Sequence, residues 1–331
     1  MTLKDLFSST PLLREGRMPE LVGATDWLNT EPLTNDDLLG KVVAVDFWTH
    51  TCINWLRTLP YLRAWSEHYS SHGLVVIGVH TPEFSIEHDV DTVGRVSRAL
   101  GVEYPVAIDN DYEVWNAFGN HYWPALYIAD HRGDLRYHHF GEGAYDRSEH
   151  AIRRLLEDAG AQIPAEPASV ETRGIERSAD WHEVRSPETY VGVAQAQGFS
   201  SPGRPVIDEP NDYAVPDRLH LNQWALGGSW ILGVEAAVCN EPGARIAYRF
   251  HARDVNLILA PPTGGSAHFR VRLDGAEPGN AHGLDVDEHG NGNVTDARLY
   301  QLIRQSHAVE DRLVEVELLD RGTAAYCFTF G

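Results

Sequence analysis

The sequence is short of basic residues and of long apolar runs, and each shortage excludes a class of protein. Lysine and arginine together number 27 against 48 aspartate and glutamate residues, so the formal net charge is −21. Because no basic cluster stands out, neither nucleic acid nor an anionic membrane is an expected partner. No run of about 18 apolar residues exists, and residues 1–10 lack a signal-peptide core, so we expect a cytoplasmic protein without a membrane span.

Cysteine is also scarce, with Cys52, Cys239 and Cys327 the only three in 331 residues. Cys239 and Cys327 fall in strand-like segments of the C-terminal half, and we interpret both as structural thiols. Cys52 lies differently, between an apolar strand pattern at residues 42–45 and apolar residues that recur at helical spacing from Ile53 onward. The sequence therefore places Cys52 at a strand-to-helix junction.

A cysteine at a helix start is a candidate nucleophile. Unpaired backbone N–H groups and the helix dipole favour the thiolate, and can lower a cysteine pKa from about 8.5 to roughly 3.5–7.5. The alternative is a buried, inert cysteine, which is a common role for this residue. We favour the nucleophile because of the helix-start position.

Two histidines near Cys52 are candidates for thiol activation or proton transfer. His50 precedes the cysteine by two residues, and His80 ends the apolar run 74–79. Both are expected on loops at strand ends, where an open α/β sheet places its site. The alternative is that His50 is solvated and His80 caps the following turn. No Cys or His pair has zinc-ligand spacing, so we predict neither a metal nor a cofactor.

Length and patterning predict two domains. Over residues 1–160 strands alternate with helical patterns, which indicates an α/β layer fold. Residues 161–180 contain prolines among polar residues and are interpreted as a linker. Over residues 181–331, short alternating runs such as those around Val271 and Val316 predict an antiparallel β-sandwich of the jelly-roll type.

Several separated motifs resemble one family. Residues 46–55, Asp-Phe-Trp-Thr-His-Thr-Cys-Ile-Asn-Trp, resemble the strand and active-site turn of the thioredoxin superfamily. Together with residues 57–62, 78–84 and 122–125, they look like the redoxin domain of DipZ-type proteins, which is TlpA-like and AhpC/TSA-like. Segments in the second half are similar to the β-rich domain that follows in that family, namely residues 186–190, 250–257 and 299–303.

The resemblance implies roles for individual residues. Cys52 would be the nucleophile, Pro124 the cis-proline opposite the active-site turn, and Trp123 with Pro124 the substrate-facing wall. Asp46 corresponds to the buried carboxylate that moves a proton to and from a second cysteine. That second cysteine would stand at position 55, where this chain has Trp55. Asp46 is therefore either a relic or a general acid or base for a different reaction.

Three functions follow as hypotheses. The first is a monothiol redox protein in which Cys52 attacks a disulfide or a peroxide and an external thiol resolves it. For the peroxide, Thr49 is placed as in peroxiredoxins. The second is a recruited non-redox enzyme that holds a small-molecule substrate in an apolar pocket of Trp48, Trp55 and Trp123. The third is a redox-inactive binding or scaffold protein.

The β-rich domain resembles a carbohydrate-binding module, and its aromatic residues have two possible roles. Trp224, Trp230 and Tyr300 could stack on a sugar or fill the core. We favour the core, because large aromatic side chains dominate core energetics.

Overall fold

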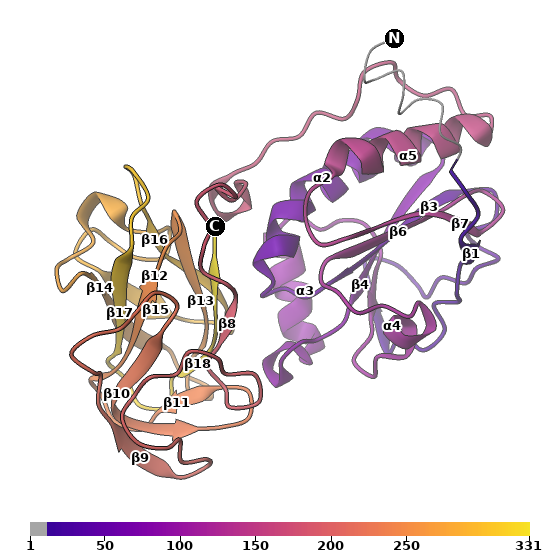
Figure 1. Ribbon diagram of the computed structural model, residues 1–331. Coiled ribbons are helices and arrows are strands. Elements are labelled where there is room, and N and C mark those ends of the chain that lie inside the picture. The colour runs from indigo at the N-terminus through magenta and orange to yellow at the C-terminus, as the bar shows by residue number, and fades with distance from the viewer. Residues whose placement is uncertain (1–11) are drawn as a thin grey trace. The chain divides into compact units, whose positions relative to one another are not determined.

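The structure is a computed structural model that describes residues 12–331 (Figure 1). Residues 1–10, on which the signal-peptide expectation depends, lie outside this range. The chain forms two compact units, and the boundary in the sequence falls between Glu176 and Arg177. Within the described range, no helix combines the length and the apolar character that a membrane crossing needs.

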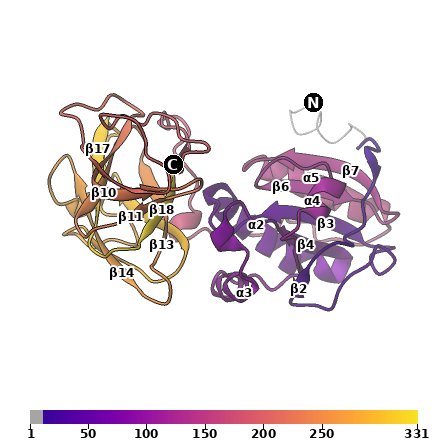
Figure 2. The same ribbon diagram turned by 90° about the horizontal axis from the view of Figure 1, so that it is seen from below.

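The first unit is a thioredoxin-like α/β fold, as predicted, built on a seven-stranded sheet. The strand order is β1-β7-β6-β3-β4-β5-β2, and β3 runs parallel to β4, beside it, and antiparallel to β6 (Figure 2). The strands are β1 (Gly16–Arg17), β2 (Asp26–Leu28), β3 (Val42–Trp48), β4 (Leu74–His80), β5 (Val106–Ile108), β6 (Ala125–Ala129) and β7 (Asp134–Phe140). The helices are α2 (Ile53–Tyr69), α3 (Val90–Ala99), α4 (Glu113–Ala117) and α5 (Tyr145–Asp158), with short 3₁₀ turns η1 (Ser70–His72), η2 (Ser85–Glu87) and η3 (Gly174–Glu176).

The central strand and the helix after it position the candidate site. Every residue of β3 is buried, which explains its continuous apolar pattern. Helix α2 begins at Ile53, so the predicted helical spacing from this residue is confirmed. The turn between the two elements, residues 49–52, carries Cys52 as the N-cap of α2.

Most of the segment predicted as a linker packs against the first unit. Arg153 of α5 donates hydrogen bonds to the backbone carbonyls of residues 164–166, at 2.9–3.1 Å. Glu149, also on α5, accepts the backbone N–H of Ala168 at 2.6 Å. We call residues 164–176 the strap. Prolines and polar residues predicted a linker, whereas side chains of α5 form hydrogen bonds with four backbone groups of this segment.

The second unit is an antiparallel β domain, as predicted. One path of strands runs β15-β14-β17-β12-β10-β11-β18-β13-β16, with β8 added to β18 and β9 to β10. The bounds are β8 (Thr189–Tyr190), β9 (Pro210–Tyr213), β10 (Trp224–Leu232), β11 (Ala237–Cys239), β12 (Ala244–Phe250), β13 (Asp254–Ala260), β14 (Ala267–Leu273), β15 (Asn291–Val294), β16 (Arg298–Arg304), β17 (Arg312–Leu318) and β18 (Ala324–Phe330), with a 3₁₀ turn η4 (Gly279–Ala281). Strand β10 pairs with β12 through residues 224–227 and with β11 through residues 230–232. The sheet is therefore continuous and curls around its core, and a jelly-roll connectivity stays a prediction.

Burial in this unit follows the predicted alternation in some strands and departs from it in others. Inward residues alternate with outward ones along β14, as expected from the sequence. Strand β18 is buried at all seven positions because β11, β13 and β8 pair with it inside the sheet. Trp224, Trp230 and Tyr300 are at most 1% exposed. The prediction that these aromatics fill the core is confirmed.

Candidate functional site

Cys52 lies at the start of α2 with its thiol partly exposed. Its backbone carbonyl accepts the N–H of Leu56 at 3.0 Å, which is the first bond of the helix. Its Sγ lies 3.8 Å from the carbonyl oxygen of Trp123. The peptide bond between Trp123 and Pro124 is cis. The thiol therefore faces the Trp123–Pro124 loop, and the first turn of α2 has no acidic residue to oppose a thiolate.

Trp55 fills the core beneath the thiol. Its side chain is fully buried and stacks on that of Trp48, with ring centroids 4.0 Å apart and planes 17° apart. Its indole Nε1 donates a hydrogen bond to Asp46 Oδ2 at 3.1 Å. Because Trp48 is also fully buried, neither ring offers surface to a substrate. The predicted substrate pocket of Trp48, Trp55 and Trp123 is therefore not formed, since stacking removes two of its walls from solvent.

Asp46 is a buried acid in the centre of β3, with no exposed surface. Burial raises the pKa of Asp46 well above its usual range, and the hydrogen bond from Trp55 opposes this shift only in part. Its Oδ1 has no hydrogen-bond partner within residues 12–331. Burial therefore favours the neutral form of the carboxyl group, which lies next to an indole rather than a second thiol.

His50 and His80 are buried together and bonded to each other. His50 Nδ1 lies 3.3 Å from His80 Nε2, and the two rings are nearly parallel. The alternative of a solvated His50 is wrong, because the side chain is 2% exposed. Burial, and next the nearby His50, lower the pKa of His80 well below its usual range. The pair joins the turn 49–52 to the end of β4, and His80 is neutral at neutral pH.

A buried carboxylate that the sequence did not single out also reaches this turn. Glu87, in η2, is fully buried. Its Oε1 accepts the hydroxyl of Thr51 at 2.5 Å, and its Oε2 accepts the backbone N–H groups of Glu83 and Phe84 at 2.5 and 2.9 Å. Glu87 lies just after the motif at residues 78–84. The one sequence feature that could have indicated its burial is its position between the apolar residues Phe84 and Val90.

Trp123 lies on the other side of the Cys52 thiol, and its role as a substrate-facing wall stays a prediction. Its indole Nε1 donates to the carbonyl of Thr81 at 3.0 Å, so it ties the cis-proline loop to the end of β4. The neighbouring Tyr122 is 52% exposed and packs against Phe140, which is 41% exposed, with ring centroids 4.9 Å apart. An exposed aromatic pair therefore adjoins the loop that contacts Cys52.

Thr49 lies inside the turn rather than on its surface. It is fully buried, and its carbonyl accepts the backbone N–H of Cys52 at 3.2 Å. Its hydroxyl has no hydrogen-bond partner among the residues that the structure describes. The backbone of Thr49 thus shapes the turn, and its hydroxyl faces the protein interior.

The two remaining thiols are buried in the second unit. Cys239 ends β11, and burial raises the pKa of its thiol to about 11. Cys327 lies within β18, fully buried, with its Sγ 3.4 Å from the carbonyl oxygen of Phe328. Both positions agree with the predicted structural thiols. Over residues 12–331, no cluster of three or more His, Cys, Asp or Glu side chains could hold a metal ion.

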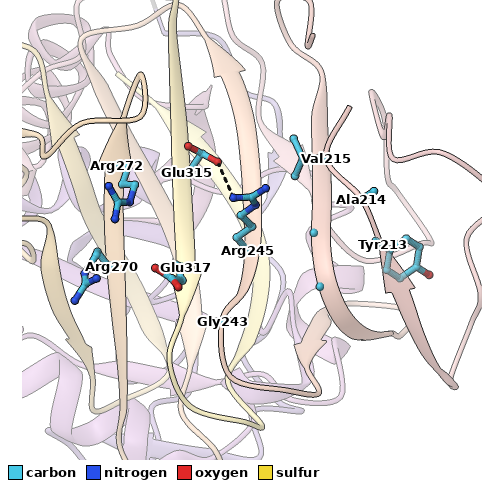
Figure 3. A pocket seen from close by; sticks show the side chains of 11 residues that line it. Tyr213, Ala214, Val215, Gly243, Arg245, Arg270, Arg272, Glu315 and Glu317 are labelled. Carbon is cyan, nitrogen blue, oxygen red and sulfur yellow. Dashed lines mark ion pairs between the residues drawn. The ribbon is translucent and has the colours of Figure 1, made fainter. Parts of the chain in front are cut away.

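A polar groove of about 590 Å³ crosses the solvent-facing side of the second unit (Figure 3). Its charged side chains alternate in sign from strand to strand. Glu317 of β17 is in register with Arg245 of β12 on one side and Arg270 of β14 on the other. Arg245 also lies 3.8 Å from Glu315. Such cross-strand charge pairs stabilise a solvated sheet face, and they need no ligand.

Comparisons with known proteins agree with this description. A model of the AhpC/TSA family matches residues 18–138, and a model of the thioredoxin-like C-terminal domain matches residues 186–331. Protein DipZ of Mycobacterium tuberculosis is 38% identical over 266 residues, which cover 78% of this chain and 37% of DipZ. The chain therefore matches little more than a third of that relative's length.

Shorter relatives cover less than half of this chain and nearly all of their own length. The thiol-disulfide oxidoreductase YkuV of Bacillus subtilis is 30% identical over 140 residues, which cover 42% of this chain and 93% of YkuV. A solution structure of a thioredoxin-like protein in the oxidised form is 29% identical, covers 44% of this chain and 97% of its own, and has a TM-score of 0.41.

Proposed function

Because the chain belongs to the thioredoxin-like thiol-disulfide oxidoreductases, with an AhpC/TSA-type domain followed by a thioredoxin-like C-terminal domain, we propose that it exchanges disulfides through the single thiol of Cys52. The observation that carries this proposal is the partly exposed Cys52 at the start of α2, which faces the Trp123 carbonyl and has Trp55 one turn further on. A helix start favours the thiolate, which is the attacking species.

The reaction has two exchanges. The Cys52 thiolate attacks one sulfur of a disulfide, a bond forms between Sγ and that sulfur, and the second sulfur leaves as a thiolate. In ordinary dithiol proteins a second cysteine would then break the mixed disulfide. Here an external thiol attacks the substrate sulfur instead, leaves with it as a new disulfide, and regenerates the Cys52 thiolate. Electrons come from the external thiol, and no other oxidant or reductant is needed.

Trp55 supports the single-thiol route. The indole occupies the place where the fold would hold a second thiol, and it satisfies Asp46 Oδ2 by a hydrogen bond. Asp46 therefore has no thiol to deprotonate at position 55. Cys239 and Cys327, both buried within strands of the other unit, are poor candidates for replacing it.

The substrate class follows from the relatives and from the surface beside the thiol. Relatives named as thiol-disulfide oxidoreductases favour thiols or protein thiols as substrates. The exposed Tyr122 and Phe140 offer apolar area next to the Trp123–Pro124 loop. This surface suits a polypeptide disulfide better than hydrogen peroxide, which has no apolar group to bury.

The two alternatives are less well supported. A recruited enzyme needs an apolar pocket, and two of its three walls, Trp48 and Trp55, are buried against each other. A redox-inactive scaffold gives no reason for a partly exposed thiol at a helix start.

Intact mass spectrometry after incubation with glutathione disulfide tests the proposal. We expect one glutathione adduct, located on Cys52 by peptide mapping, which persists until an added thiol removes it. Cys52→Ser serves as the control and should form no adduct. A folded protein that gains no adduct at Cys52 would favour the scaffold.

A further inference from the structure

The turn 49–52, which carries the reactive thiol, is fastened by a buried carboxylate that the reaction above does not use. Glu87 has no exposed surface, and it accepts three hydrogen bonds from Thr51, Glu83 and Phe84. All three partners act as donors to it, so both oxygens of the carboxyl group serve as acceptors. Burying a carboxyl group is costly, so this one needs a reason beyond filling space.

Its contacts connect two segments that are distant in the sequence. Two of the hydrogen bonds hold the loop between β4 and α3, which contains η2. The third holds Thr51, which directly precedes Cys52 and is fully buried. A change in the position of Glu87 would therefore shift Thr51. Because Thr51 is bonded to Cys52, the position of the thiol would shift with it.

Glu87 contacts the residue next to Cys52, so a negative charge on it would act on the same thiol. A negative charge near a thiol disfavours the thiolate, and in a buried setting the effect is weakly screened. Other titratable groups near the turn include His50 and His80, which are bonded to each other, and Asp46, which accepts a hydrogen bond from Trp55. Arg57 of α2 is paired with Glu142 at 3.0 Å. Burial favours the neutral forms of Asp46 and His80, and Glu87 is an acidic side chain that hydrogen-bonds directly to a residue of this turn.

We propose that Glu87 is a positioning residue for Cys52, which fixes the turn through Thr51 and restrains ionisation of the thiol by its negative charge. The two effects have opposite consequences for reactivity. The hydrogen bond holds the thiol toward the Trp123 carbonyl, and the charge keeps the thiol protonated to a higher pH than the helix start alone would. The inference rests on Cys52 being the reactive thiol proposed above.

Glu87→Gln separates the charge from the geometry. The glutamine oxygen can accept both backbone N–H groups, and its amide can donate to the Thr51 hydroxyl, which is able to reverse its role. All three contacts are kept while the charge is lost. We expect the pH midpoint of Cys52 alkylation to fall by roughly half a unit to one unit. Glu103→Gln, the same change at an exposed position, should leave the midpoint where it is in the wild type.

Thr51→Val tests the geometry without removing the charge. It keeps the branched shape and deletes the hydroxyl, so the alkylation rate at a pH where the thiol is fully ionised should fall several-fold. Thr51→Ser, which retains the hydroxyl, should restore that rate. Both variants keep Glu87 in place, so they remain informative if a Glu87 variant fails to fold.

The outcomes separate this inference from the proposed function. An unchanged midpoint in Glu87→Gln, or an upward shift, overturns the electrostatic role. An unchanged rate in Thr51→Val overturns the positioning role. In either case glutathione adducts at Cys52 would still support the disulfide exchange, whereas a Cys52 that forms no adduct at any pH would refute that function first.

Discussion

The two units bury titratable side chains in different settings, and the difference indicates which of them carries chemistry. Around Cys52 the first unit gathers Asp46, His50, His80 and Glu87, all of them buried and titratable. In the second unit the core is a broad apolar cluster of the curled sheet, and the buried Asp254 is paired with Arg253 and Arg304. Burying titratable groups costs stability, and proteins accept that cost most often at functional sites.

The thiols follow the same division. Cys52 is partly exposed at a helix start, whereas Cys239 and Cys327 are buried in strands. The comparison predicts that removing or altering groups of the first unit changes reactivity, and that the thiols of the second unit are silent.

Removing the thiol of Cys52 should abolish disulfide exchange. Cys52→Ser should form no mixed disulfide, because the hydroxyl is not a nucleophile at neutral pH. Cys239→Ser and Cys327→Ser should react as the wild type does, provided that they fold, as judged by circular dichroism. Adduct mass with glutathione disulfide measures all three. A normal adduct yield in Cys52→Ser would mean that the reactive thiol does not lie in the first unit.

The native protein should label at Cys52 well before the other thiols. At pH 8 a thiol with a pKa of about 11 is ionised in roughly one molecule in a thousand, and Cys239 is also shielded from reagent. Timed alkylation with peptide mapping checks the order. In urea the three cysteines should label at similar rates, which serves as the control. Faster native labelling of Cys239 or Cys327 would place the reactive site in the wrong unit.

Trp55→Cys should convert the site to a dithiol at a cost in stability. The fully buried indole leaves a cavity, and comparable large-to-small changes cost about 3–5 kcal/mol of unfolding free energy. A disulfide between Cys52 and the new thiol should form, and insulin reduction should rise from background. Trp181→Cys, at a residue 58% exposed, is the matched control and should do neither. Strong insulin reduction by the wild type would mean that another thiol resolves Cys52.

Asp46→Asn should stabilise the protein at neutral pH relative to acidic pH. The folded state raises the pKa of Asp46, so it binds the proton more tightly than the unfolded chain does. Wild-type stability therefore falls as pH rises from about 3.9 through the raised pKa. The variant lacks this pH dependence. The difference between its urea midpoint and that of the wild type should therefore be larger at pH 7 than at pH 4. An equal difference at both values would show that Asp46 is ionised in the fold.

The sequence predicted the site well where the information is local. The strand pattern before Cys52 and the helical spacing from Ile53 placed the thiol at the helix start, where the structure has it. Local patterns also predicted the antiparallel strands of the second half, including β14 and β17.

The sequence did not predict contacts that depend on how segments meet. The bond between His50 and His80 requires the parallel register of β3 and β4, in which Trp48 lies opposite His80. The contact of Glu87 with Thr51 depends on the path of the loop after β4. The stacking of Trp55 on Trp48 depends on the approach of α2 to the sheet. None of these is visible in spacing along one segment.

The strap changes where the chain can be cut. Glu176, its last residue, accepts a hydrogen bond from Arg63 of α2 at 2.6 Å, and the carbonyl of Ser178 already accepts one from Arg253 of the second unit. Only Arg177 lies between these two anchor points. A fusion or truncation ending near residue 160 would remove the hydrogen-bond partners of Arg63 on α2 and of Glu149 and Arg153 on α5. To replace the second unit with another domain, the junction should therefore be placed at residue 177, between the hydrogen-bonded Glu176 and Ser178.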